Sequence, residues 1–476
     1  MQAVATHPLF VGGEWVDTDA HDLIRLPYDG SPVAEVPHAD LSIVNRAVAA
    51  AAKASKLMAE LANFQRADLL TKLAELIKRD RAEFAQLIAS ETGKPIREAR
   101  VEVDRCPQTV LAAAHEARQL RGEVVPMDFA PGGQGRMAMT VREPVGVIGS
   151  ITPFNFPLNL ALHKIAPAFA AGNAVVHKPA ERTPLSALRL ARTMEEAGVP
   201  KGAYNVITGN GPELAGAMLR HPDVAMIAFT GSVQVGTEIR SKAGLKRTLL
   251  ELGNNSAVII EPDGDLKTAV QRTVQGAFSH SGQVCISVQR AFVHSSLMSD
   301  FIEALTAQTA KLRIGHPFEE STDISSLIDE NAAIRVASWI DEATNAGAAN
   351  ICGGKRRYAT IEPTILTGVP GQARISCEEV FGPVVAVYEY EDLDDAVARV
   401  NNTPYGLQAG IFTQDIQKAF RSARKLKMGG VLINDVPMFR MDHMPYGGAK
   451  QSGLGREGPR YALEEMTEPK LICWKA

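Results

Sequence analysis

Cys285 is the residue of this sequence best suited to nucleophilic chemistry. It lies in the run Ser281–Ser287 (SGQVCIS), whose small and polar members are unusual neighbours for a core cysteine. A cysteine thiolate attacks carbonyl carbons and forms covalent intermediates. Cys377 is the poorer candidate, because the acids Glu378 and Glu379 that follow it would raise its pKa.

Glu251 and Asn155 are the polar residues that could assist such a nucleophile. Glu251 stands between leucines at the end of an expected strand, and burial there would raise its pKa toward neutrality, as a general base requires. Asn155 lies in the turn Thr152–Pro157 (TPFNFP), where two prolines and two aromatics hold one amide that could donate to an oxyanion. The alternatives are a partly exposed strand-end acid and an ordinary capping asparagine.

Two strand-to-helix turns have the composition of a nucleotide site. Phe229–Gly236 (FTGSVQVG) offers Gly231 for a close backbone approach and free N–H groups at a helix start, although its spacing is not GxGxxG. Lys178 and Glu181 follow another strand, where they could bind the two hydroxyls of an adenosine ribose. A carboxylate at that place repels a 2′-phosphate and favours NAD over NADP. An exposed surface pair is the alternative.

Length and composition describe an ordinary globular enzyme of two or three domains. The chain has 476 residues, a hydrophobic content of 45% and a formal net charge of -4. No charge cluster indicates nucleic-acid binding, and neither a signal peptide nor a membrane span is expected. The five cysteines show no metal-ligand spacing, so no metal site is expected. They are expected to be reduced thiols of a cytoplasmic protein.

Helical and strand patterns alternate along most of the chain. Residues 42–92 and 97–120 have helical spacing, with Asp40 or Ser42 as a candidate first cap. Short apolar strands and amphipathic helices then alternate from Val145 to Ile260, and a second such series runs from Ala291 to Asn434. This alternation predicts an α/β protein with doubly wound parallel sheets.

Taken in order, seven motifs resemble those of the aldehyde dehydrogenase superfamily over nearly the whole chain. They are Pro153–Pro157, Lys178–Glu181, Phe229–Ser232 with Gly236, Glu251–Gly253, Gly282–Cys285, Glu379–Pro383 and Pro445–Gly453. Each alone is weak, and together they are specific. The resemblance implies two doubly wound parallel-sheet domains with a small oligomerisation β-extension.

The resemblance also implies roles for single residues. Cys285 would be the nucleophile, Glu251 the general base and Asn155 the oxyanion donor, and Lys164 resembles a position near the active site. The cofactor NAD, with NADP not excluded, would be held by residues from several motifs. These are Thr152, Phe154, Lys178, Glu181, Gly231, Ser232, Glu379 and Phe381.

The implied reaction is oxidation of a small aldehyde to its carboxylic acid, through a thiohemiacetal and a thioester on Cys285. Glu251 would activate the hydrolytic water, which disfavours an acyl-transferring or reductive relative. A non-catalytic protein that retains the fold is a further alternative. Two positions depart from the family pattern: Phe154 replaces a usual tryptophan, and Asn254 replaces a common glycine with an effect that the sequence leaves open.

The substrate side resembles lactaldehyde, non-phosphorylating glyceraldehyde-3-phosphate and phosphonoacetaldehyde dehydrogenases. Val284 stands where phosphate-using relatives commonly place an arginine, which weakens the case for a phosphorylated substrate. Arg105 and Arg440 match other anion-binding positions and could clamp a carboxylate, sulfonate or phosphonate. In the alternative, Arg105 is a helix-surface charge and Arg440 pairs with Asp442. Semialdehyde and aromatic-aldehyde dehydrogenases of the same superfamily are alternatives for the activity.

The resemblance divides the chain into three parts. Residues 1–121 and 145–252 would form the NAD-binding domain, and residues 253–447 the catalytic domain. Residues 122–144 and 463–476 would form bridging segments with strands at Arg136–Val141 and Lys470–Trp474. Such strands leave exposed edges in a monomer, so a homodimer or homotetramer is expected.

Overall fold

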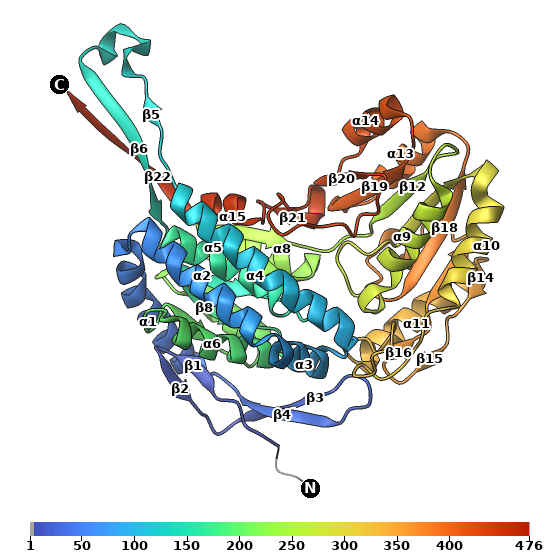
Figure 1. The fold of residues 1–476 in the computed structure, drawn as a ribbon, viewed down its shortest axis with the longest axis horizontal. Helices are drawn as coiled ribbons and strands as arrows, with labels where there is room; N and C mark the ends of the chain where they lie inside the picture. The colour runs from blue at the N-terminus through green and yellow to red at the C-terminus, as the bar shows by residue number, and fades with distance from the viewer. Residues whose placement is uncertain (1–3, 476) are drawn as a thin grey trace.

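Two large sheets organise the chain (Figure 1). The computed structural model describes residues 4–475. The first sheet has eight strands in the order β2-β1-β9-β8-β7-β10-β11-β21, and its five central strands, from β9 to β11, are parallel. The strands are β1 (Leu9–Val11), β2 (Glu14–Val16), β7 (Val147–Ile151), β8 (Ala174–Lys178), β9 (Tyr204–Val206), β10 (Val224–Thr230), β11 (Arg247–Glu251) and β21 (Gly453–Leu454).

Helices cover this first sheet and build its core. α5 is buried along its whole length, because its sequence is almost entirely apolar, and it packs against α4 and α15. The helices are α1 (Leu41–Glu60), α2 (Asn63–Arg79), α3 (Arg81–Thr92), α4 (Ile96–Gln119), α5 (Asn159–Ala171), α6 (Leu185–Ala197), α7 (Gly211–Arg220), α8 (Val233–Lys242) and α15 (Pro459–Glu465). An antiparallel hairpin of β3 (His21–Arg25) and β4 (Pro32–Pro37) lies beside them.

The second sheet has seven strands in the order β14-β17-β18-β13-β12-β19-β20, all parallel except β14. They are β12 (Ala257–Ile260), β13 (Arg290–His294), β14 (Ala349–Cys352), β17 (Thr364–Thr367), β18 (Val384–Tyr390), β19 (Gln408–Phe412) and β20 (Gly430–Ile433). The helices of this half are α9 (Leu266–Phe278), α10 (Met298–Thr309), α11 (Glu330–Asn345), α12 (Arg374–Cys377), α13 (Leu393–Asn401) and α14 (Ile416–Lys425), and β15 (Arg356–Arg357) pairs with β16 (Thr360–Ile361).

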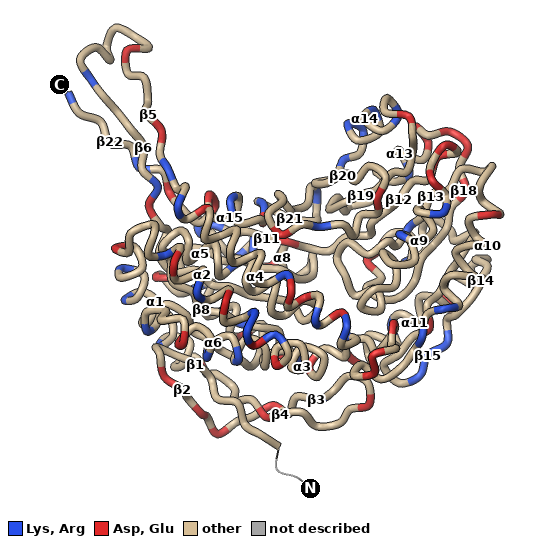
Figure 2. The backbone as a smooth tube through the Cα atoms, in the orientation of Figure 1, with Lys and Arg blue, Asp and Glu red and all other residues tan. Residues whose placement is uncertain are grey.

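A three-stranded arm projects from the first half of the molecule (Figure 1). β22 (Thr467–Lys475) pairs over nine residues with β6 (Arg136–Pro144), and β5 (Val124–Val125) adds a short third strand. Figure 2 draws most of the arm in tan, with several charged positions along β6 and β22. Its apolar side chains Met137, Leu471 and Trp474 are exposed.

Parallel pairing brings the strand ends of the first sheet to one edge. Phe229 of β10 lies opposite Ile151 of β7, and Ile151 lies opposite Lys178 of β8. On the other side, Thr230 lies opposite Glu251 of β11. The segments that follow these strands therefore emerge together, at the place where open α/β sheets bind ligands.

The predicted α/β class and parallel sheets are confirmed, with local differences. The helical stretch 42–92 is three helices, because the chain is extended at Leu61 and Ala62 and turns at Asp80. Asp40 is the residue that caps α1, through its side chain and the N–H of Ile43. Among residues 4–475, no helix combines the length and apolar character that crossing a membrane requires.

Candidate active site

Cys285 follows a strained turn at the start of the second half. His280, Ser281 and Gly282 have successive φ values of 49°, 52° and 72°. Gly282 is required there, because a Cβ atom would lie 2.1 Å from the carbonyl oxygen of Gly382. Left-handed non-glycine residues are uncommon and cluster at functional sites. The turn presents Cys285 to a cavity between the two halves.

The sulfur of Cys285 contacts one polar side chain, that of Tyr446, with Sγ and Oη 2.8 Å apart. Apolar side chains of Val284, Ile286 and Leu407 pack around the pair. Burial raises the pKa of the Cys285 thiol to about 11, although the Tyr446 hydrogen bond and the Arg440 charge both lower it.

Glu251 ends β11, as expected, and is only 3% exposed. Neither carboxyl oxygen has a hydrogen-bond partner among the described residues. Burial, and then the nearby charge of Glu457, raise the pKa of Glu251 well above its usual range. Both Glu251 and Cys285 line the same cavity, so the fold brings the two separated motifs together.

The Asn155 side chain is buried beside the cysteine loop. Its Nδ2 donates to the carbonyl oxygen of Gln283 at 3.0 Å, and its Oδ1 accepts from the N–H of Phe156 at 3.1 Å. The amide is therefore tied to the loop that carries Cys285. Its predicted donation to an oxyanion stays a prediction, because it requires this amide to turn from Gln283 toward the reacting oxygen.

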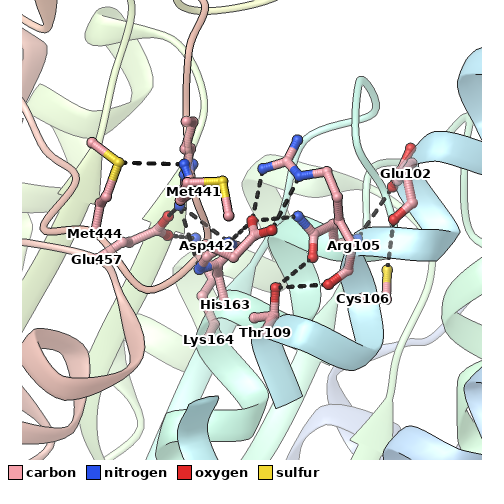
Figure 3. Close-up of polar contacts among 12 residues, drawn as sticks. Glu102, Arg105, Cys106, Thr109, His163, Lys164, Met441, Asp442, Met444 and Glu457 are labelled. Atoms are coloured by element: carbon pink, nitrogen blue, oxygen red, sulfur yellow. Dashed lines mark hydrogen bonds and ion pairs between the residues drawn. The ribbon is translucent and has the colours of Figure 1, made fainter. Parts of the chain in front are cut away.

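A buried network of charged groups adjoins the site (Figure 3). Glu457 receives a hydrogen bond from Lys164 at 2.5 Å and one from Arg440 Nη2 at 3.3 Å. Burial alone would raise the pKa of Glu457, but Lys164, His163 and Arg440 outweigh it and hold the pKa well below its usual range. Glu457 is thus a fixed negative charge at the cavity wall.

Asp442 organises the other side of this network. Arg105 donates to its two oxygens, at 2.7 and 3.1 Å, and His163 contacts it at 2.9 Å. The alternative in which Arg440 pairs with Asp442 and Arg105 is a plain surface charge is wrong. Arg105 holds Asp442 across 337 positions of sequence, while Arg440 pairs with Glu457.

A cavity of about 610 Å³ extends from the ends of β8 and β10 to Cys285. Its lining includes every residue that the sequence assigned to the cofactor, namely Thr152, Phe154, Lys178, Glu181, Gly231, Ser232, Glu379 and Phe381. Arg105 and Arg440 are not among the residues that line it. The cofactor candidates thus lie along a single continuous cavity.

Lys178 and Glu181 occupy one end of this cavity. Their Nζ and Oε1 atoms are 3.9 Å apart, and Glu181 also accepts from the N–H of Gly211 at the start of α7. Burial lowers the pKa of Lys178. Ser232 caps α8, and Gly231, Ser232 and Val235 line the adjoining part of the cavity.

Glu379 and the phenylalanines lie nearer the cysteine. Phe154 and Phe381 form an edge-to-face pair with ring centroids 5.7 Å apart. Glu379 accepts from the N–H of Asn254 at 3.0 Å, and burial raises its pKa to about 7. The Asn254 side chain itself binds Ser256 and accepts from the N–H of Leu407, which are contacts that a glycine would lack.

A model described as "Aldehyde dehydrogenase family" matches residues 15–472. The chain belongs to the aldehyde dehydrogenase family. It is therefore an oxidoreductase that acts on the aldehyde group, as its motifs predicted.

Curated relatives and solved structures agree with this family. A 3-sulfolactaldehyde dehydrogenase of Priestia megaterium is 48% identical over 98% of both chains. A lactaldehyde dehydrogenase of Methanococcus aeolicus is 40% identical over 98% of this chain and 99% of its own. The crystal structure of aldehyde dehydrogenase 21 from Physcomitrella patens, in complex with the reaction product succinate, is 38% identical with a TM-score of 0.96 and covers 99% of both chains.

Tyr446 and Glu457 are the site residues that the sequence reasoning did not single out. Tyr446 stood within the Pro445–Gly453 motif, and Glu457 follows shortly after it. A tyrosine in a glycine-rich motif carries no signal of its own for a contact with Cys285. The position of Glu457, four residues after the end of this motif, was a weak signal for a role in the site.

Proposed function

We propose that this enzyme oxidises a small, anionic hydroxyaldehyde to its carboxylic acid, with NAD as the preferred acceptor. Cys285 attacks the aldehyde carbon, and the carbonyl electron pair moves to oxygen, which Asn155 and the Cys285 N–H stabilise. Loss of hydride leaves a thioester on Cys285. Glu251 then removes a proton from water, which attacks the thioester and releases the acid.

The residues along the cavity fit a nicotinamide dinucleotide. The bound cofactor supplies the hydride acceptor. Lys178 and Glu181 would hold the adenosine ribose, while the start of α8 at Gly231 and Ser232 would hold the phosphates. Glu379 and Phe381 would position the nicotinamide half, since they line the same cavity as Cys285.

The state of Glu181 supports NAD over NADP. Its side chain is 49% exposed, and its carboxylate lies near Lys178 and the N–H of Gly211. A 2′-phosphate at this position would meet that carboxylate and be repelled. NADP is not excluded, since a glyceraldehyde-3-phosphate dehydrogenase of Methanocaldococcus jannaschii solved with NADP is 39% identical, has a TM-score of 0.92 and covers 96% of this chain and 100% of its own.

Arg440 carries the proposal of an anionic substrate. Its Nε is buried without a hydrogen-bond partner among the described residues, and a buried donor without a partner is costly. Its guanidinium lies against Tyr446, whose hydroxyl contacts the Cys285 sulfur. Arg105 is 27% exposed and held in a fixed orientation by Asp442, and its Nη1 has no hydrogen-bond partner within the part of the chain that the structure describes. A small tail anion that reaches beyond the residues lining the cavity would satisfy both guanidinium groups.

Because the chain is similar to a 3-sulfolactaldehyde dehydrogenase, 3-sulfolactaldehyde is the first aldehyde to test. Val284 in place of an arginine beside the nucleophile favours a sulfonate or carboxylate over a phosphate. The second candidate is a semialdehyde with a terminal carboxylate. It is favoured by the succinate complex of a chain with the same fold at a TM-score of 0.96.

The test is NADH absorbance with a panel of aldehydes. It contains 3-sulfolactaldehyde, lactaldehyde, glyceraldehyde-3-phosphate, succinic semialdehyde and benzaldehyde. We expect the largest kcat/KM with 3-sulfolactaldehyde, and in Arg440→Ala a larger loss of kcat/KM for anionic than for neutral aldehydes, because Arg440 also contacts Tyr446. Equal losses of kcat/KM on anionic and neutral aldehydes would count against anion binding by Arg440. A fully active Cys285→Ser variant would contradict the proposed mechanism.

Three structural expectations belong to the same proposal. The NAD-binding domain comprises 1–121 with 145–252, and the catalytic domain comprises 253–447. Residues 122–144 and 463–476 serve self-association as a homodimer or homotetramer, which the exposed apolar arm supports. A cytoplasmic location fits the cysteines, which are all free thiols in the structure.

A further inference from the structure

The contact between Tyr446 and Cys285 is specific rather than incidental. The 2.8 Å separation of Oη and Sγ is short for a hydrogen bond to sulfur, and Tyr446 is only 3% exposed. No other side-chain polar group of residues 4–475 is recorded in hydrogen-bond contact with this sulfur. The buried Tyr446 hydroxyl therefore forms its hydrogen bond with the Cys285 sulfur.

Both ends of Tyr446 are held in place. Its backbone pairs with Glu457 in two hydrogen bonds, at 3.0 and 2.7 Å, which form an antiparallel bridge. The Arg440 guanidinium stacks on its ring, with Cζ 3.7 Å from the ring centroid, and is itself bound to Glu457. The hydroxyl is thus aimed at Cys285 by groups that do not touch the sulfur.

The charges around the pair determine which atom donates. Burial raises the pKa of Tyr446 well above its usual range, so the phenol keeps its proton at working pH. Arg440 faces the sulfur as a positive charge, whereas Glu379 and Glu251 face it as acids that oppose ionisation. Once Cys285 has lost its proton, a neutral phenol beside it can only donate.

We propose that Tyr446 is a further catalytic residue: its hydroxyl donates a hydrogen bond to Cys285 and stabilises the thiolate that attacks the aldehyde. The thiol S–H bond breaks, its electron pair stays on sulfur and its proton passes to water. When sulfur then bonds to the aldehyde carbon it loses its charge and becomes a weak acceptor, which frees the hydroxyl. This proposal rests on the nucleophilic role proposed for Cys285.

The test measures the thiol without aldehyde or cofactor, so it is independent of turnover. Iodoacetamide alkylation of Cys285 is followed by peptide mass spectrometry from pH 6 to pH 11, about the range over which a cysteine thiol titrates, in the full-length protein and in Tyr446→Phe. We expect Cys285 in Tyr446→Phe to be alkylated about tenfold more slowly at each pH below its midpoint, which corresponds to a midpoint higher by about one pH unit. Tyr461→Phe is the matched control, because Tyr461 lies on α15 and its hydroxyl makes no hydrogen bond with residues 4–475.

A second variant keeps the test decisive if Tyr446→Phe does not fold. 3,5-Difluorotyrosine at position 446 retains the hydroxyl and makes it a stronger donor, so its alkylation midpoint should fall below that of the unmodified protein. Unchanged midpoints in Tyr446→Phe and in the fluorinated protein would overturn the proposal. Failure of the proposed function would appear differently, as undiminished NADH production by Cys285→Ser whatever the alkylation midpoints are.

Discussion

Glu251 has two buried carboxyl oxygens that no described residue engages, so the group is free to act on water. Replacing it by glutamine removes the base and keeps the shape. We expect Glu251→Gln to give an initial burst of NADH and a steady rate lower by about 100-fold or more, since general-base catalysis contributes about 10²–10⁴-fold. Stopped-flow absorbance at 340 nm separates the burst from the steady phase.

The control for this variant is Glu464→Gln, an exposed acid on α15, which should keep the full steady rate. The pH dependence follows from the raised pKa of Glu251. The deprotonated form of Glu251 predominates only above that pKa, so the rate of thioester hydrolysis by the unmodified enzyme should increase as the pH rises. A steady rate of Glu251→Gln equal to that of the parent would refute the role.

Glu181 should decide between the two nicotinamide dinucleotides. Glu181→Ala removes the carboxylate that meets a 2′-phosphate, so we expect the ratio of kcat/KM for NADP to that for NAD to rise by about tenfold, the effect of about 1.4 kcal/mol. Glu213→Ala is the control, since Glu213 lies in the first turn of α7 and does not line the cavity. An unchanged ratio in Glu181→Ala would show that other groups select the cofactor.

Single residues differ in how far the sequence could predict them. Cys285 and Glu251 stand in distinctive local runs, and the structure brings them to one cavity. The ion-pair partner of Arg440 could not be predicted from the local sequence. Asp442 is its near neighbour in sequence, yet that acid is taken by Arg105 from α4, a contact that only the tertiary fold creates.

At the scale of elements, α4 positions the turn that carries Asn155. Glu102 of α4 is buried and accepts from the N–H groups of Leu158 and Asn159 at the start of α5. Its other oxygen binds Lys94 at 2.6 Å, and the Lys94 ammonium lies 3.9 Å from the centroid of the Phe156 ring. A buried ion pair therefore holds the segment that directly follows Asn155.

Breaking this pair from one side should be costly. Glu102→Gln leaves the buried Lys94 charge without its hydrogen-bonded counter-charge, and we expect a loss of about 3–5 kcal/mol in unfolding free energy. Urea unfolding followed by tryptophan fluorescence measures it. The double variant Lys94→Met with Glu102→Gln should recover part of the loss, because no unpaired charge remains.

The matched control lies on α3 and α4, the helices on either side of Lys94. Arg81 and Asp104 join α3 to α4 by an ion pair that is about half exposed. Asp104→Asn should cost less than about 1 kcal/mol, as is usual for surface pairs. Equal losses in Glu102→Gln and Asp104→Asn would show that the buried pair has no special weight.

Element types were predictable, whereas their limits were less so. Alternating apolar strands and amphipathic helices indicated parallel sheets because burial on both faces leaves a clear pattern. The final strand was expected at Lys470–Trp474 but extends over Thr467–Lys475. Pairing with β6, not local propensity, determines the length of β22. Glu468 and Pro469 are unfavourable in strands, yet they pair with residues of β6.

At the scale of the whole molecule, the arm predicts self-association. β22 is an edge strand with exposed apolar side chains, and Leu471 is 57% exposed. A second copy of the chain would cover them. We expect Leu471→Lys to reduce the particle mass in light scattering, whereas Leu245→Lys, a charge placed at an exposed loop leucine, should not. Monomeric behaviour of the unmodified protein would contradict this expectation.

The pairing of β6 with β22 also has a consequence for how the chain is made. Synthesis proceeds from the N-terminus, so β6 emerges long before its partner, which lies more than 300 residues later. β11 also emerges before its outer neighbour β21, which lies 202 residues later (453 − 251). Until those residues are translated, both strands present open edges that other nascent chains can join. The ribosome-bound protein should therefore depend on chaperones until the last strands are in place.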